Sequence, residues 1–160
     1  KKDPPEILAK RHLFWVRLNV KGRGSTLFVG TAHFAPASME RERQEGINPR
    51  LDEARETLKH LERLAPSGEA CLFMGDLNEP VNAIRILRAG GLKDSFTSLG
   101  IVHRHTHPAI PMTRGTTPQL LDWQFHRGPV RAMSTTVDDF YYEGVAPSDH
   151  KPVVTTYALE

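Results

Sequence analysis

The stretch that most constrains the fold is a short apolar run, residues 71–74, followed by Gly75, Asp76 and Asn78 and then by a helix-like segment, 81–89. An apolar run of this length that ends at a glycine predicts a buried strand. Side chains alternate along an extended chain, so Asp76 and Asn78 are expected to face one target. The amide-bearing end of the following helix is then expected beside any anion that they hold. The same pattern also suits a simple turn.

A strong helix pattern comes directly before this strand. Asn48 and Pro49 are typical of a helix cap and a first helical residue, and apolar residues recur at helical spacing from Leu51 to Leu64. A helix that leads directly into a buried strand predicts a layered α/β domain.

The remaining chain offers further strands. Extended runs at 13–20 and 27–32, separated by a glycine-rich connector, predict a β-hairpin. Strand character recurs at 120–126, 130–137 and 153–159, and a second helix is expected to end at Gly90 and Gly91. Residues 39–44 are typical of a solvated loop or helix face, 93–96 of a turn, and 101–119 of an irregular segment.

Length and composition limit the possibilities. With 160 residues, 39% of them hydrophobic, we expect a single domain over 1–160 with one core. No apolar run approaches the roughly 20 residues that cross a bilayer. The balance of 21 basic against 19 acidic residues neither indicates nor excludes nucleic acid. The single cysteine, Cys71, excludes an intrachain disulfide and is expected to be a buried strand thiol.

Chemistry-bearing residues stand where predicted strands begin or end. His33 follows the second strand of the hairpin, and Asp149 and His150 precede the terminal strand. Asp122 interrupts an apolar strand and needs a partner, because an unpaired buried carboxylate is costly. Each of these residues alone also suits an ordinary structural role.

The irregular segment contains further candidates. His103, His105 and His107 stand at alternate positions, which suits either one side of a zinc-binding strand or a polar loop with incidental histidines. Arg114 either binds a substrate phosphate or is a solvated loop residue.

Four motifs occur in a definite order: Thr31-Ala32-His33, Gly75-Asp76-Leu77-Asn78, Leu121-Asp122-Trp123 and Ser148-Asp149-His150. This set resembles the endonuclease/exonuclease/phosphatase superfamily, and the match resembles the C-terminal half of its domain. The resemblance implies a deoxyribonuclease I-like α/β fold, a layered β-sandwich with outer helices. It also implies a hydrolase that uses Mg²⁺ or Mn²⁺ and an activated water to cleave phosphodiesters or phosphomonoesters. The implied substrates are nucleic acid, phospholipid or inositol phosphate.

The resemblance also implies roles for single residues. His150 is the expected general base or the residue that stabilises the phosphoryl oxygens, and Asp122 the partner of its other ring nitrogen. Asp76 is expected to orient water or assist the metal, and Asn78 to donate to a phosphoryl oxygen. His33 is expected to bind a phosphate oxygen or assist the leaving group.

By the same resemblance Asp149 is a metal ligand. The family also brings an asparagine and a metal-binding glutamate from an N-terminal half, and Glu6 does not match that glutamate's setting. We therefore expect the missing half to come from the same protein or from another chain. The alternative is a catalytically incomplete domain of this fold that serves binding or assembly. Residues 101–119 are the segment expected to select the substrate.

Overall fold

The computed structural model describes residues 11–37, 39–109 and 117–160, so Glu6 and Arg114 lie outside the described part of the chain. Described strands form a five-stranded sheet in the order β1-β2-β3-β5-β4 and a two-stranded sheet, β6-β7. The elements are β1 Phe14–Asn19, β2 Thr26–Thr31, α1 Met39–Glu45, α2 Pro49–Leu64, β3 Ala70–Asp76, α3 Asn82–Ala89, β4 Lys93–Asp94, α4 Ser95–Ser98, β5 Asp122–Arg127, β6 Val130–Val137 and β7 Val153–Leu159.

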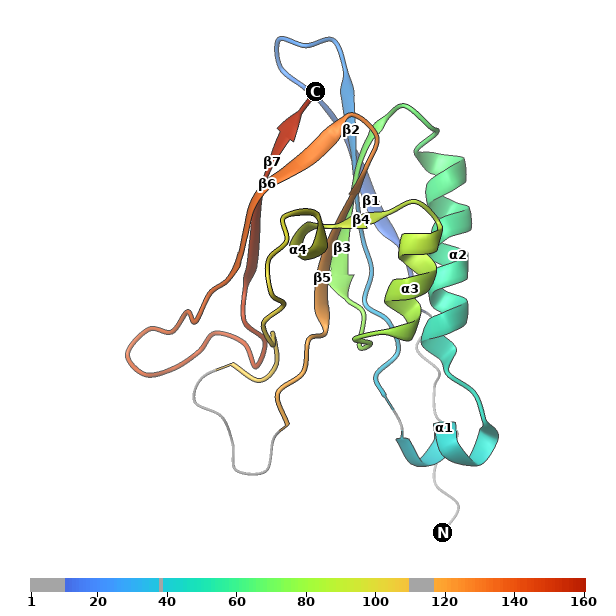
Figure 1. Ribbon diagram of the computed structural model, residues 1–160, viewed down its shortest axis with the longest axis vertical. Helices are drawn as coiled ribbons and strands as arrows, with labels where there is room; N and C mark the ends of the chain where they lie inside the picture. Colours follow the sequence, from blue (N-terminus) through green and yellow to red (C-terminus); the bar gives the residue numbers. More distant parts are fainter. Residues whose placement is uncertain (1–10, 38, 110–116) are drawn as a thin grey trace.

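These elements form three layers, with α2 and α3 on one face of the five-stranded sheet and β6 with β7 on the other (Figure 1). The antiparallel hairpin of β1 and β2 is confirmed. The chain then crosses over through α1 and α2, so that β3 pairs with β2 in parallel. β5 pairs with β3 in the antiparallel direction.

Alternation along β3 explains why this strand lies between two layers. Cys71 and Phe73 are fully buried in the core that contains residues of α2 and α3. Ala70 and Leu72 belong instead to the smaller cluster with Val130 of β6. A strand buried on both faces reads as a continuous apolar run, as this one does. The predicted layered β-sandwich with outer helices is confirmed.

Of three local features predicted from the sequence, the helix cap and the buried thiol are confirmed and one turn is wrong. Asn48 caps α2 as expected, because its side chain accepts a hydrogen bond from the backbone N–H of Arg50. Cys71 is a buried thiol as expected, and burial raises its pKa to about 11. The turn predicted at 93–96 is wrong: Asp94 ends β4 and caps α4 by accepting from Thr97 N at 2.9 Å.

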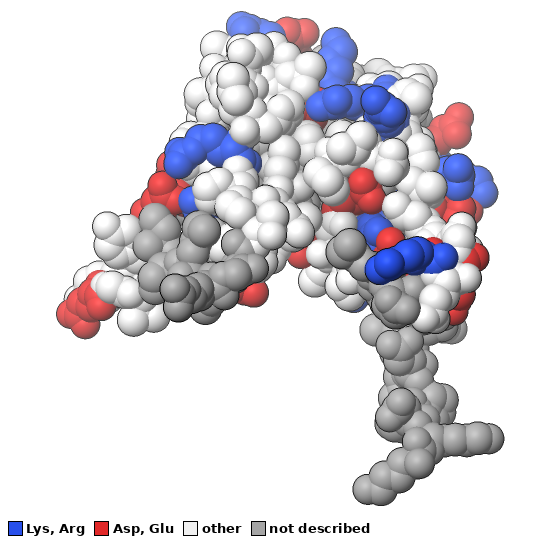
Figure 2. Space-filling model, turned by 60° about the horizontal axis from the view of Figure 1, so that its bottom comes forward, with Lys and Arg blue, Asp and Glu red and all other residues white. Residues whose placement is uncertain are grey.

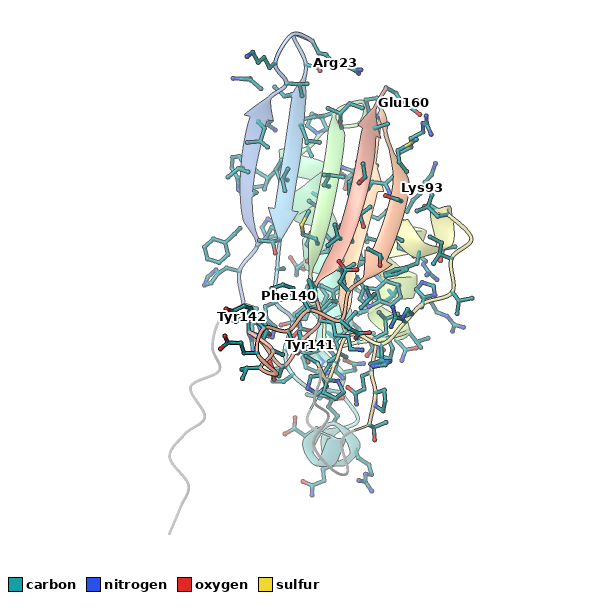
Figure 3. All side chains as sticks on the ribbon, turned by 90° about the vertical axis from the view of Figure 1, so that its left-hand side faces the viewer. Arg23, Lys93, Phe140, Tyr141, Tyr142 and Glu160 are labelled. Atoms are coloured by element: carbon teal, nitrogen blue, oxygen red, sulfur yellow. The ribbon has the colours of Figure 1, made fainter. Side chains whose placement is uncertain are left out.

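The chemistry-bearing ends of the strands gather at one end of the molecule, the bottom in Figure 1. Figure 3 shows the loop with Phe140, Tyr141 and Tyr142 at the end opposite Arg23 and Glu160. These three aromatic side chains are exposed. No helix among the described residues is both long and apolar enough to cross a bilayer.

Candidate active site

Four chain segments meet at this end of the five-stranded sheet. Asp76 ends β3 and lies directly opposite Asp122, the first residue of β5. His33 lies just beyond β2, in a segment that continues the parallel pairing: Phe34 N donates to Asp76 O at 2.9 Å. His150 precedes β7. The sheet register therefore brings together residues that lie up to 117 positions apart in sequence.

Gly75 allows β2 and β3 to approach this closely. Its φ of +153° is rare for other residues, and a Cβ at this position would overlap the backbone carbonyl of Ala32. The glycine that ends the apolar run is therefore required by the backbone next to His33 and Asp76.

His150 and Asp122 form the shortest contact of the site, with 2.7 Å between Nδ1 of His150 and Oδ2 of Asp122. The carboxylate only accepts, so the proton lies on Nδ1 and Nε2 is left facing the site. Burial lowers the pKa of His150, but its hydrogen bond to Asp122 and the charges of Asp122, Asp76 and Asp149 outweigh burial and raise it. The partner that Asp122 was predicted to need is His150.

Asp76 lies between the two histidines. Its Oδ2 is 3.3 Å from Nε2 of His33 and 3.9 Å from Nε2 of His150. Burial raises the pKa of Asp76, and the neighbouring charge of Asp122 raises it further. Two carboxylates and two imidazoles therefore share one half-buried site.

Asn78 reaches this site through a turn. Its φ is +47°, and its backbone N–H donates to Oδ1 of Asp76 at 2.9 Å. The strand-alternation argument for these two residues was therefore wrong, although both face the site. The side-chain amide donates to Phe34 O at 3.0 Å and lies 3.2 Å from Nε2 of His33. Asn78 thus holds the His33 segment against the end of β3.

The start of α3 is already occupied by an acid of the chain. Oε1 of Glu79 accepts from the backbone N–H groups of Val81 and Asn82, at 3.1 and 2.9 Å. The prediction that this helix end lies beside an anion held by Asp76 and Asn78 is therefore corrected, because Glu79 takes that place.

Glu79 and Arg50 were not recognised in the sequence, yet they connect the elements around the site. Arg50 is buried, with its guanidinium bonded to Glu42 at 2.6 Å and 3.4 Å from Oε2 of Glu79. Asn48 donates to the same Glu79 oxygen at 3.0 Å. Glu79-Pro80 ahead of a helix is the only local signal, and it indicates a cap rather than a buried ion pair.

Thr106 is a second residue that sequence reasoning missed. It is fully buried, and its hydroxyl accepts from the backbone N–H groups of Leu121 and Asp122 at 3.0 and 3.1 Å. Its carbonyl accepts from Lys151 N at 2.7 Å. One residue thus fixes both segments that carry the Asp122 and His150 pair.

The three alternate histidines do not form one metal site. His103 lies against Phe96 and Trp123, and His105 accepts from Nζ of Lys151 at 2.9 Å. Only His107 lies near the site, with its ring 4.9 Å from that of His150. Of the two interpretations of this segment, the zinc-binding strand with three histidines on one side is therefore wrong.

Two groups of side chains in the described residues have the composition of a metal site. One contains Asp76, Asp122 and His150; the other contains His107, Asp149 and His150. Asp149 has 81% of its side chain exposed and is open to a ligand. Mg²⁺ binds through one or two carboxylates and keeps several waters, and each group offers it a carboxylate, Asp76 in the first and Asp149 in the second. Arg114 lies outside the described residues.

Figure 2 brings the site end of the molecule forward and shows the Lys and Arg side chains of the described residues in separate groups. A protein that binds nucleic acid mainly by charge presents Lys and Arg clustered on one face.

Comparison with solved structures finds the same fold. TDP2 from D. rerio, solved with a single-strand DNA product, is 19% identical with a TM-score of 0.76 over 96% of this chain and 64% of that one. An endonuclease/exonuclease/phosphatase from Bacteroides vulgatus is 18% identical with a TM-score of 0.74, over 94% and 56%. A mannosyl-6-phosphatase from Bacteroides thetaiotaomicron is 17% identical with a TM-score of 0.72, over 93% and 57%.

This chain thus spans less than two thirds of the length of each of these three structures. No family model matches the sequence, and no curated protein matches it. At these identities the likeness concerns the fold, which the four sequence motifs also predict. The chain has the deoxyribonuclease I-like α/β fold that these structures share, and it spans part of their length.

Proposed function

We propose that this chain carries most of the active site of a divalent-metal-dependent phosphoester hydrolase. The observation that carries the proposal is the meeting of Asp122, His150, Asp76 and His33 at the ends of four segments. Phosphoester hydrolysis needs a water made nucleophilic and donors for the charge on the phosphoryl oxygens. The two carboxylates and two imidazoles of this site can supply the acceptor that activates the water and the donors to the phosphoryl oxygens.

In this proposal His150 is the residue that exchanges a proton with the attacking water or donates one to a phosphoryl oxygen. Its Nδ1 is fixed by Asp122, so Nε2 is the nitrogen that faces the attacking water or a phosphoryl oxygen. Neutral His150 accepts a proton from water, and protonated His150 donates to a phosphoryl oxygen. The hydrogen bond to Asp122 and the neighbouring carboxylates raise the pKa of His150, which favours its protonated form relative to a free imidazole.

Asp76, Asn78 and His33 form the opposite wall. Asp76 orients the water by accepting one of its hydrogens between His33 and His150. His33, which has 58% of its side chain exposed, reaches a phosphate oxygen or the leaving group. The Asn78 amide that now lies against His33 becomes a donor to the substrate when His33 turns to the phosphate.

Mg²⁺ or Mn²⁺ bound by Asp149 and Asp76 would neutralise charge on the phosphate and on the leaving oxygen. Arg114 is proposed as a further phosphate ligand. The substrate is a nucleic acid, a phospholipid or an inositol phosphate, and residues 101–119 are proposed to select among them.

A further polypeptide segment, from the same protein or from another chain, is proposed to complete the site. All six residues of β1 are exposed, and β1 is one of the two edge strands of the sheet among the described strands. Large apolar side chains on it are exposed by 45–70%: Phe14, Trp15, Val16 and Leu18. An edge strand with apolar side chains is a surface on which another strand can pair.

The test is an activity panel on the natural full-length protein, with Mg²⁺ or Mn²⁺ and with DNA, RNA, phospholipid and inositol phosphate substrates. We expect activity on one class that is lost in EDTA and restored by Mg²⁺. His150→Ala should lower kcat by at least about 100-fold. Activity that survives this substitution would refute the role of His150. A well-folded protein inactive on every class would favour the alternative, a binding or assembly domain.

A further inference from the structure

A second group of potential ligands lies beside the proposed catalytic residues. The ligand atoms of His107, Asp149 and His150 lie within 4.8 Å of one another. Two imidazoles and one carboxylate differ from the oxygen-rich set that Mg²⁺ prefers. Zn²⁺ binds such nitrogen and oxygen ligands, and sites with two histidines and one acid leave a fourth position open.

The two histidines of this group are held in place. The backbone of His107 pairs with Gln119 through hydrogen bonds of 3.0 and 2.8 Å. Nδ1 of His150 is bonded to Asp122, which leaves Nε2 as its free ligand atom. A carboxylate on the far nitrogen is the arrangement that orients metal-bound histidines in proteins.

The ring nitrogens of His107 make no hydrogen bond to another described residue. Its Nδ1 is buried and has no hydrogen-bond partner there. Its Nε2 lies 4.0 Å from Oδ2 of Asp149, too far for a hydrogen bond. A metal at Nε2 would therefore displace no hydrogen bond between described residues.

To close the group around one ion, its ligand atoms must come nearer together than the 4.8 Å within which they now lie. Ligand atoms around tetrahedral Zn²⁺ lie about 3.3 Å apart, given bonds of about 2.0 Å. The Asp149 side chain is 81% exposed and is free to rotate inward. Its backbone carbonyl accepts from Ala109 N at 2.6 Å, so the main chain stays in place.

We propose that His107, Asp149 and His150 form a Zn²⁺ site that withdraws Nε2 of His150 from hydrolysis. Zinc binding is independent of the proposed function, whereas inhibition by zinc rests on it. Zn²⁺ and substrate then compete for one imidazole, and the enzyme is inactive while zinc is bound.

The test is a Zn²⁺ titration of the natural protein against a chromogenic chelator, with Co²⁺ as a spectroscopic probe. We expect one tight Zn²⁺ per chain and the intense visible bands of four-coordinate Co²⁺. His107→Ala should weaken binding by at least about 100-fold, since even partners of ligands contribute 10- to 100-fold. Asp149→Asn, at an exposed position, should also weaken it without affecting folding. His60→Ala on α2 is the matched control and should change nothing.

Zinc affinity that is unchanged in both His107→Ala and Asp149→Asn would overturn the site. So would loss of zinc in Asp76→Asn alone, which would place the ion with Asp76 and Asp122. If the protein hydrolyses a substrate with Mg²⁺, equimolar Zn²⁺ should inhibit it, and His107→Ala should remove that inhibition. Zinc binding without any hydrolysis would refute the proposed function and leave the metal site intact.

Discussion

Asp122 is the residue on which the geometry of the site depends. It fixes which nitrogen of His150 carries the proton, at a distance of 2.7 Å. The sequence predicts that Asp122 needs a partner, because a carboxylate interrupts an apolar strand there. The residues by themselves do not identify that partner, because Asp122 and His150 lie 28 positions apart and meet only through the packing of β5 against the segment before β7. The superfamily resemblance does name His150, and the structure agrees with it.

Replacing Asp122 tests this dependence. Asp122→Asn keeps the shape but removes the charge and the acceptor that raise the pKa of His150. We expect the NMR-titrated pKa of His150 to lie above 6.5 in the metal-free protein and to fall in the variant. Activity should drop by at least about 100-fold. An unchanged His150 pKa in Asp122→Asn would contradict the assignment of this pair.

Thr106 offers a residue-scale test with a matched control. Thr106→Val preserves the shape but leaves the N–H groups of Leu121 and Asp122 without their acceptor. Losing the acceptor of buried N–H groups costs about 1–3 kcal/mol, which urea denaturation measures. Thr106→Ser keeps the hydroxyl and should lie closer to the wild type. Equal stability of the valine and serine variants would show that these bonds contribute little.

Among the elements, the close approach of β3 to the end of β2 depends on one glycine. Gly75→Ala places a methyl group against the backbone of Ala32, where no flexible side chain can give way. We expect a loss of at least about 2 kcal/mol in the free energy of unfolding. Gly22→Ala, in the turn between β1 and β2, shares a positive φ but has open space around it. It should cost less, and a similar loss in both variants would point to backbone conformation rather than overlap.

Glu79 connects α2 and α3, and its backbone carbonyl accepts from Nε1 of Trp123 in β5 at 3.2 Å. Its carboxylate makes the stability of the fold depend on pH. Burial opposes its ionisation, but the N–H groups of Asn82 and Val81, with Asn48 and Arg50, outweigh burial and lower its pKa. A lowered folded-state pKa means that the stabilisation is present above the unfolded value of about 4.3 and is lost as pH falls through the folded value.

Urea midpoints from pH 7 to pH 3 should therefore fall more steeply for the wild type than for Glu79→Gln. The variant should already be less stable at pH 7, because a neutral amide cannot replace the carboxylate at Arg50 and at the helix end. Parallel curves for the two proteins would rule out Glu79 as a source of the acid sensitivity.

For the molecule as a whole, local patterns predict the strands and helices better than their connections. The cap at Asn48 and the run 71–74 are local signals, and the elements there form as expected. The prediction that the four motifs lie together at one end of the molecule rests only on their resemblance to a known superfamily. Arg50, Glu79, Thr106 and His107 carry no local signal of their roles, since these roles arise from long-range packing of segments.

The pairing of Asp76 with Asp122 has a measurable effect on overall stability. Like charges directly opposite in an antiparallel pair repel each other. Asp76→Asn removes this repulsion and should raise the midpoint of thermal unfolding while abolishing hydrolysis. Calorimetry of the variant at pH 7 measures the first effect. A lower midpoint would mean that the contacts of Asp76 with His33 and His150 outweigh the repulsion.

The pairing of Asp76 opposite Asp122 also suggests a way to locate the active site without knowing its substrate. Random variants selected only for resistance to heat should accumulate neutral residues at Asp76, because selection that ignores activity removes whatever destabilises the fold. The positions at which such selection replaces the original residue would then mark the end of the molecule that carries the active site.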